Sequence, residues 1–130
     1  MEQAPARFAC DVETIDGGAL LMLSGELDLS SAPMLRGCLR TLTDAGAMLI
    51  VIDVDGLRFV DSSGIRAIAA EARRIRKRGG TVVVRRPHEW TRRLFNVLGA
   101  TELVTLQEAT LDTTPLLDLR RTGASPLLPT

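Results

Sequence analysis

Residues 51–64 read Val51-Ile52-Asp53-Val54-Asp55-Gly56-Leu57-Arg58-Phe59-Val60-Asp61-Ser62-Ser63-Gly64. The beginning of this stretch belongs to an apolar run, 48–54, that only Asp53 interrupts, and such a run is typical of a central strand covered on both faces. The end of the stretch places capping residue types directly before a helical pattern, so it predicts a helix start. The stretch therefore joins a buried strand to a helix, as expected in an α/β domain.

The helix that follows is predicted by apolar residues at helical spacing, namely Ile65, Ile68, Ala69, Ala72 and Ile75. Upstream, the patterns predict a half-exposed strand at 7–13, a glycine turn at 16–18, a strand at 19–23 and a polar connection at 24–29. A helix follows, capped by Ser30 or Ser31 with Pro33 in its first turn, and ends at Gly46. Downstream, they predict a strand at 81–84, a helix at 89–98 and an edge strand at 103–106. We expect one α/β domain over residues 7–108, with helices packed on a mixed sheet, and a partly disordered tail over 109–130.

The composition excludes several classes of protein. Sixteen basic and sixteen acidic residues leave no net charge, which argues against nucleic-acid binding. No apolar run approaches the roughly 20 residues that span a bilayer, and the N-terminus lacks the pattern of a signal peptide, so we expect a cytoplasmic protein. Cys10 and Cys38 lack metal-ligand spacing and are expected to be small core residues rather than a disulfide or a metal site.

The Asp61-Ser62-Ser63-Gly64 element has two interpretations. Backbone amides at a helix start are unpaired and favour an anion, so a phosphoserine there would change a surface without unfolding the domain. The same four residues also form an ordinary capping sequence, with Asp61 or Ser62 as the N-cap. Residue chemistry alone leaves both open.

Four segments, read together and in order, resemble the STAS domain, and more closely the bacterial anti-sigma factor antagonists. The segments are Leu23-Ser24-Gly25-Glu26-Leu27-Asp28, Ser31-Ala32-Pro33, Val51-Ile52-Asp53 and Phe59-Val60-Asp61-Ser62-Ser63-Gly64. The resemblance implies a sheet of four or five strands with about four α-helices, no enzymatic activity and no cofactor. It also implies partner switching: the unphosphorylated protein binds an anti-sigma factor serine kinase and so releases a sigma factor. Phosphorylation ends the binding, and a serine phosphatase of the PP2C type resets the switch.

Carried over residue by residue, the resemblance makes Ser63 the phosphoacceptor and Ser62 its hydroxyl neighbour and cap. Asp61 would hold the loop, and Glu26 and Asp28 would lie on the preceding strand–helix loop beside it. The implied partner surface consists of Glu26, Asp28, Asp61, Ser62, Ser63, Gly64 and Arg66, with a solvated role for Arg66 as the plainer alternative. We expect a monomer or weak dimer.

Two rival classes remain to be weighed. An enzyme is disfavoured because the sequence has no nucleophile-elbow, phosphate-loop, dinucleotide or metal motif, and its one histidine, His88, suits a solvated or capping position. The other rival is a constitutive docking subunit of a transporter or a stress-signalling complex, which needs no phosphorylation cycle. On the helix at 89–98, Trp90 and Leu94 are expected in the core and Phe95 on the surface.

Overall fold

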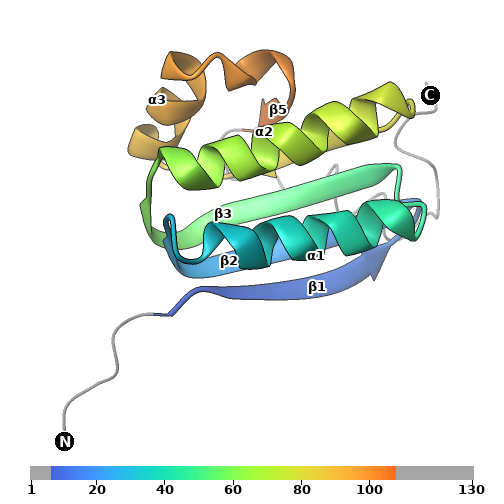
Figure 1. Cartoon of the computed structure of the whole chain (residues 1–130), viewed down its shortest axis with the longest axis horizontal. Coiled ribbons are helices and arrows are strands. Elements are labelled where there is room, and N and C mark those ends of the chain that lie inside the picture. Colours follow the sequence, from blue (N-terminus) through green and yellow to red (C-terminus); the bar gives the residue numbers. More distant parts are fainter. Residues whose placement is uncertain (1–6, 108–130) are drawn as a thin grey trace, which may run out of the picture.

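Five strands form one mixed sheet in the order β1-β2-β3-β4-β5 (Figure 1). The computed structural model describes residues 7–107. Strands β1 and β2 are antiparallel, and every other neighbouring pair in the sheet is parallel. Along the chain, the elements are β1 (Ala9–Ile15), β2 (Gly18–Leu27), α1 (Ala32–Asp44), β3 (Leu49–Val60), α2 (Ser62–Lys77), β4 (Thr81–Arg85), α3 (Glu89–Val97), the 3-10 helix η1 (Ala100–Glu102) and β5 (Thr105–Gln107).

Helices α1 and α2 lie side by side on one face of the sheet and run in the same direction (Figure 1). Apolar side chains from alternate positions of the strands meet the apolar stripes of these helices and form the main core, since alternate residues of a strand share a face. The most deeply buried members include Leu21, Ile50, Ile52, Leu35, Leu39, Ile65 and Ile68. This packing fixes the start of α2 against the ends of β2 and β3.

The α/β class and the mixed five-stranded sheet agree with the expectation from sequence. The described residues contain three α-helices and one 3-10 helix, slightly fewer than the four or so that the resemblance implied. The expected tail, 109–130, lies outside the described residues, and the domain boundaries at 7 and 108 stay predictions.

Strands β2 and β3 are longer than their apolar runs predicted. β2 continues to Leu27 through Ser24 and Glu26, for which the sequence predicts a connection, and β3 continues to Val60. Gly25 adopts φ 87°, a conformation that suits glycine, and shifts in the β2–β3 register accompany this change. At the end of β2, buried apolar residues still alternate with exposed polar ones. Ser24 and Glu26 are therefore strand residues on the exposed face of the sheet.

Helix α3 buries a different stripe from the one that the sequence predicted. Phe95 is 0% exposed and Trp90 is 54% exposed, so the expectation for these two residues was wrong. The buried face contains Thr91 and Phe95, with Leu94 and Leu98 packed partly against the core. The stripes 90/94/97 and 91/94/95/98 are both helical, and Trp90 suits the surface because its Nε1 donates a hydrogen bond to the Val60 carbonyl at 3.1 Å.

The two cysteines lie next to each other although they are 28 residues apart. Cys10 on β1 and Cys38 on α1 are free thiols, partly buried, with their Sγ atoms 3.3 Å apart. Burial, followed by a hydrogen bond with Cys38, raises the pKa of the Cys10 thiol to about 12. The Cys10 thiol is therefore protonated at neutral pH.

Candidate functional site

The start of α2 is capped by Asp61. This residue has an extended backbone, and its Oδ1 accepts a hydrogen bond from the backbone amide of Ser63 at 2.9 Å. Its own amide donates to the Leu27 carbonyl at 3.1 Å, which ties the helix start to the end of β2. Of the two alternatives left by the sequence, Asp61 is thus the cap, and the expectation that Ser62 caps the helix was wrong.

The two serine hydroxyls that follow the cap differ in their surroundings. Ser62 Oγ accepts a hydrogen bond of 3.4 Å from Arg66 Nη1, one turn further along α2. Within residues 7–107, the Ser63 hydroxyl makes no hydrogen bond; it opens instead onto a groove between α1 and α2. Ser63 is therefore half-buried, and its hydroxyl oxygen is available to a group from outside the domain.

The groove beside Ser63, which we call the α1–α2 groove, encloses about 580 Å³. It is lined by Leu29, Ala32, Pro33, Arg36, Gly37, Arg40, Ser63 and Arg66. The lining residues include three arginines and no carboxylate. Because both helices begin at this end of the molecule (Figure 1), the positive ends of their dipoles add to the same field. The α1–α2 groove is therefore suited to an anion.

Gly64 allows α2 to approach the end of β2. A Cβ atom at this position would collide with Leu27 Cγ, and Leu27 is completely buried. Only a residue without a side chain fits that contact unless Leu27 moves. The role of Gly64 in the geometry is to bring the helix start close to the sheet.

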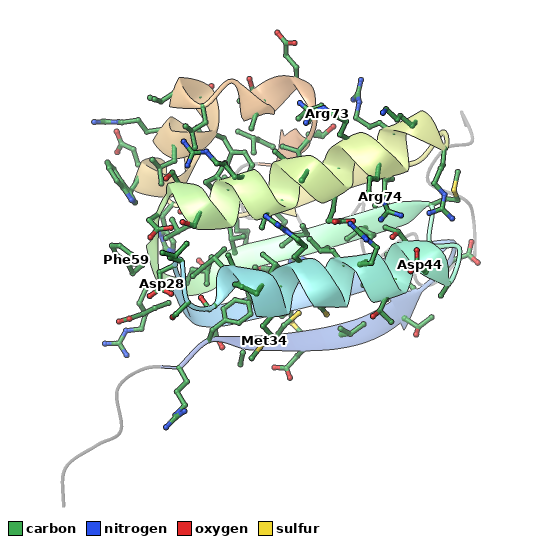
Figure 2. All side chains as sticks on the ribbon, in the orientation of Figure 1. Asp28, Met34, Asp44, Phe59, Arg73 and Arg74 are labelled. Carbon is green, nitrogen blue, oxygen red and sulfur yellow. The ribbon has the colours of Figure 1, made fainter. Side chains whose placement is uncertain are left out.

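Asp28 organises the loop between β2 and α1. Its Oδ1 accepts hydrogen bonds from the Ser30 hydroxyl at 2.7 Å and from the amides of Ser30 and Ser31 at 3.0 and 3.2 Å. The bond from the Ser30 hydroxyl is the main cause that lowers the pKa of Asp28. Figure 2 shows Asp28 and Phe59 at the end of the molecule where both helices begin. Asp28 is near the start of α2, but its carboxylate serves its own loop.

Glu26 lies on strand β2 rather than on the following loop, because β2 is longer than predicted. Its side chain is exposed and borders a separate hollow with Asp28, Ser30, Ser31, Met34 and the first described residues. The structure thus brings Asp61, Ser62, Ser63, Gly64 and Arg66 together, with Asp28 at the same end. Glu26 pairs with Phe59 of β3, two residues before Asp61, and its side chain is exposed.

Large apolar side chains are exposed around the start of α2. Leu29 is 75% exposed and lines the α1–α2 groove, and Phe59 and Trp90 border a smaller hollow beside Val60. Exposed apolar side chains grouped with polar neighbours are typical of a protein-binding surface. The sequence pattern does not distinguish Leu29 and Trp90 as surface residues, since only the fold shows that no described element covers them.

A buried carboxylate that the sequence analysis did not single out joins the two helices. Glu71 on α2 is 1% exposed and accepts hydrogen bonds from Arg40 on α1 at 3.0 Å and from Arg74 at 2.8 Å. Burial by itself raises the pKa of Glu71, but the hydrogen bonds from Arg40 and Arg74 outweigh burial and place this pKa below its ordinary value. Figure 2 shows Arg74 on the side of α2 that faces α1. The pair fixes the spacing of the helices beside the α1–α2 groove.

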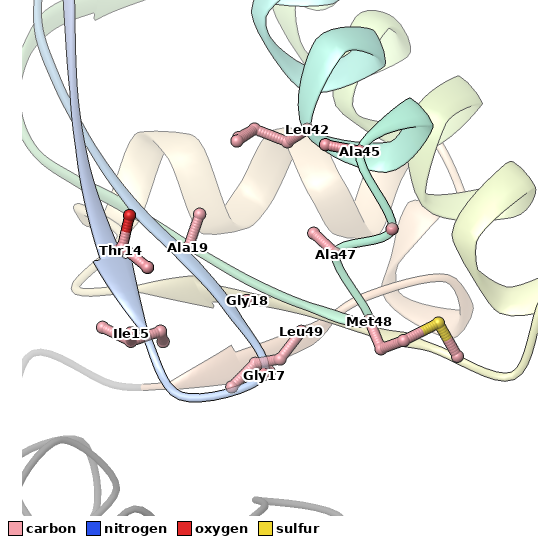
Figure 3. Close-up of a pocket in the computed structure, with 11 residues that line it drawn as sticks. Thr14, Ile15, Gly17, Gly18, Ala19, Leu42, Ala45, Ala47, Met48 and Leu49 are labelled. Atoms are coloured by element: carbon pink, nitrogen blue, oxygen red, sulfur yellow. The ribbon is translucent and has the colours of Figure 1, made fainter.

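Two further features of the described residues carry no chemistry. A cavity of about 630 Å³ at the turn between β1 and β2 is lined by side chains without an ionisable group (Figure 3). His88, exposed, contacts the Asp55 backbone carbonyl at 2.9 Å through Nε2.

Within residues 7–107, no group of three or more acidic, cysteine or histidine side chains could hold a metal ion. In the same range, no helix has both the length and the apolar character to cross a membrane.

The structure is a small α/β domain, a mixed sheet with two parallel helices on one face. Its candidate site, around the serines in the first turn of the second helix, lies at the end of the molecule where both helices begin. The chain belongs to the STAS domain family, whose model matches residues 9–113. It is 29% identical over 94 residues to the anti-sigma-B factor antagonist of Bacillus subtilis, an alignment that covers 72% of this chain and 85% of that one.

Solved structures give the same result. An anti-sigma factor antagonist from Mycobacterium paratuberculosis is 31% identical, with a TM-score of 0.71 over 92% of this chain and 99% of that chain. The Bacillus cell fate determinant SpoIIAA in its phosphorylated form is 25% identical, with a TM-score of 0.65 over 79% of this chain and 93% of that chain. The α/β fold is thus the fold of anti-sigma factor antagonists.

Proposed function

We propose that this protein is an anti-sigma factor antagonist that binds an anti-sigma factor serine kinase until Ser63 is phosphorylated. The observation that carries the proposal is the half-buried Ser63 hydroxyl, which makes no hydrogen bond within the described residues and opens onto a groove at the start of a capped helix. The antagonist role is supported by the relatives that the chain resembles, which are anti-sigma factor antagonists.

The proposed modification transfers the γ-phosphoryl group of ATP to Ser63 Oγ, with loss of the hydroxyl proton and departure of ADP. The product carries a charge of about −1.5 to −2 in the first turn of α2, where negative charge stabilises a helix. The domain therefore stays folded while the surface offered to the partner changes from neutral to anionic. A phosphatase of the PP2C type reverses the step by hydrolysis.

The remaining residues have distinct parts in this proposal. Asp61 holds the helix start through the Ser63 amide, and Gly64 sets its distance from the sheet. Arg66 and Ser62 lie beside the acceptor, and Asp28 shapes the adjoining loop. Leu29 and Trp90 supply exposed apolar area for contact with the kinase. Trp90 is the stronger anchor of the two, because tryptophan is among the residues that dominate binding energy at protein interfaces.

Phosphopeptide mapping of the protein from its native cells, with and without stress, tests the proposal. Phosphate on Ser63 in a condition-dependent fraction is the expected result. A chain that carries no phosphate in any condition contradicts the switch and favours a constitutive docking subunit.

Binding to the cognate anti-sigma factor, titrated by calorimetry, provides the second test. Ser63→Ala keeps full affinity, and Ser63→Asp weakens binding at least tenfold because a charge enters the contact surface. Thr41→Asp is the matched control and keeps full affinity, since Thr41 is exposed in the last turn of α1, away from the helix starts. Equal affinities for Ser63→Ala and Ser63→Asp would sink the proposed switch.

A further inference from the structure

The α1–α2 groove contains arginines whose charge the described fold does not neutralise. Arg36 makes no hydrogen bond or ion pair within residues 7–107, and Arg66 makes one long contact of 3.4 Å to the Ser62 hydroxyl. Arg40 differs, because its Nη2 and Nε are bonded to the buried Glu71. Two guanidinium groups, those of Arg36 and Arg66, are thus available at the groove.

Helix geometry places both of these arginines near Ser63. Arg66 follows Ser63 by three residues, and residues at that spacing are neighbours on a helix surface. Arg40 on α1 reaches Glu71 on α2, and the two helices run in parallel (Figure 1). The contact between Arg40 and Glu71 therefore sets a level that the two helices share. Moving back four residues on each helix, about 6 Å along the axis, brings Arg36 level with residue 67 of α2. Ser63 is one turn before that level, within the reach of an arginine side chain.

We propose that the α1–α2 groove is a phosphoryl site in which Arg36 and Arg66 bind the phosphate on Ser63 of the same chain. The inference rests on the proposed modification of Ser63 and deepens it. Guanidinium groups bind phosphate oxygens through short, charge-assisted hydrogen bonds, often two at a time. Arg40 stays with Glu71 and contributes only its field.

This pair of phosphate-binding arginines, Arg36 and Arg66, which we call the clamp, changes how phosphorylation acts on the partner surface. Before modification, the two free arginines and the exposed Leu29 form a cationic, apolar-lined surface that fits a partner segment with carboxylates. After modification, the phosphate is bonded to the two arginines and brings negative charge into the groove. Phosphorylation then removes two attractive groups in addition to introducing a repulsive one.

The full-length chain with phosphoserine incorporated at position 63 during translation tests the clamp, because no kinase is needed. The readout is the second pKa of the phosphate, followed by ³¹P NMR against pH. Cations within 4–6 Å lower the pKa of an acid by about 1–3 units, so we expect a value about one unit below the ordinary value of roughly 6.

The variants assign that shift to its cause. The double variant Arg36→Gln/Arg66→Gln raises the phosphate pKa by about one unit, and Arg36→Lys gives an intermediate value because lysine keeps the charge without the planar fork. Arg73→Gln is the matched control: Arg73 is an exposed arginine on the other side of α2 (Figure 2) and leaves the pKa unchanged. Thermal unfolding of each variant verifies that it is folded.

The outcomes separate the clamp from the switch. A phosphate pKa that is the same in the parent chain and in the double variant overturns the clamp and leaves the helix start as the only source of any shift. Such a result does not affect the proposed phosphorylation of Ser63. Conversely, a native protein without phosphate contradicts the proposed function, while the pKa difference still reports whether the site can hold a phosphoryl group.

Discussion

The Asp61 carboxylate accepts the backbone hydrogen bond of Ser63 at 2.9 Å, while the hydroxyl of Ser63 makes no bond within the described chain. One residue thus holds the backbone of its neighbour but leaves the neighbour's reactive oxygen available. The arrangement separates helix stability, which depends on Asp61, from chemistry at Ser63. A modification at Ser63 Oγ breaks no hydrogen bond of the cap.

Replacing the cap tests this division. We expect Asp61→Ala to lower the free energy of unfolding by about 1 kcal/mol, the usual cost of losing an N-cap side chain. Ser62→Ala is the matched control and changes it by less than about 0.5 kcal/mol, because Ser62 is partly exposed and does not cap the helix. Urea denaturation measures both. A larger loss for Ser62→Ala than for Asp61→Ala would contradict the assignment of the cap.

Two glycines in the helices should respond in opposite ways to alanine. Gly64→Ala places a methyl group against the buried Leu27, and overpacking of this kind costs about 1–3 kcal/mol. Gly37→Ala, in the interior of α1 with no atom within 4 Å, gains about 0.5–1 kcal/mol from helix propensity. Thermal unfolding of both variants provides the comparison. A neutral Gly64→Ala would show that Leu27 has room to move.

The α/β fold could be predicted because its signals are local. The apolar run before Asp53 predicted a central strand, and the capping sequence at Asp61 predicted the start of α2 to within a residue. The ends of β2 and β3 were misplaced because polar residues on an exposed strand face look like a connection. For α3, two overlapping helical stripes were available, and only its docking against the rest of the fold selects Phe95 over Trp90.

The electrostatics of the site could not be predicted in the same way. Arg40 and Glu71 are 31 residues apart in sequence, so their pairing depends on how α1 packs beside α2. In the sequence, Glu71 is one charge among several on a helix and resembles a solvated residue. The available Arg36 is recognised only after Arg40 is seen to be engaged with Glu71. Charges that meet through tertiary packing leave no pattern in a single sequence.

The helix–helix ion pair provides a stability prediction. We expect Glu71→Gln to lower the free energy of unfolding by about 2 kcal/mol, within the range for losing charge-assisted hydrogen bonds. Arg40 and Arg74 are partly exposed and regain water, which limits the cost. Glu89→Gln, at an exposed pair with Arg93, is the control and changes little. Chemical denaturation at pH 7 measures the free energy of unfolding of both variants. A loss for Glu71→Gln no larger than that for Glu89→Gln would show that the pair with Arg40 and Arg74 does not stabilise the fold.

The same carboxylate gives a pH dependence with a defined sign. The pKa of Glu71 is lowered from its ordinary value of 4.5 in the folded protein, so its ionised form stabilises the fold. That contribution is complete above pH 4.5 and is lost as the pH falls through the folded-state pKa. The difference in unfolding free energy between the parent chain and Glu71→Gln should therefore shrink on acidification. A difference that is constant from pH 7 to pH 3 would contradict this sign.

The thiol pair predicts a loss of stability at alkaline pH. The pKa of Cys10 is raised from 9.0 to about 12 in the folded protein, whereas the unfolded chain deprotonates near 9. The unfolded state therefore loses its proton first, and the free energy of unfolding falls as the pH rises from 9 toward 12. Besides the second thiol, Cys38, few side chains obscure this range, because the chain has no tyrosine and its only lysine is Lys77.

Cys10→Ala should flatten the alkaline decline, while Lys77→Gln, the control for the only lysine side chain, should not. Denaturation of the reduced protein at several pH values between 8.5 and 11 measures the slope, with a reductant present so that no disulfide forms. We also expect Cys10 to react slowly with iodoacetamide at pH 8, because only the thiolate is nucleophilic and the raised pKa keeps it scarce. A slope that persists in Cys10→Ala, together with fast alkylation of Cys10 in the folded protein, would show that burial beside Cys38 does not hold this thiol neutral.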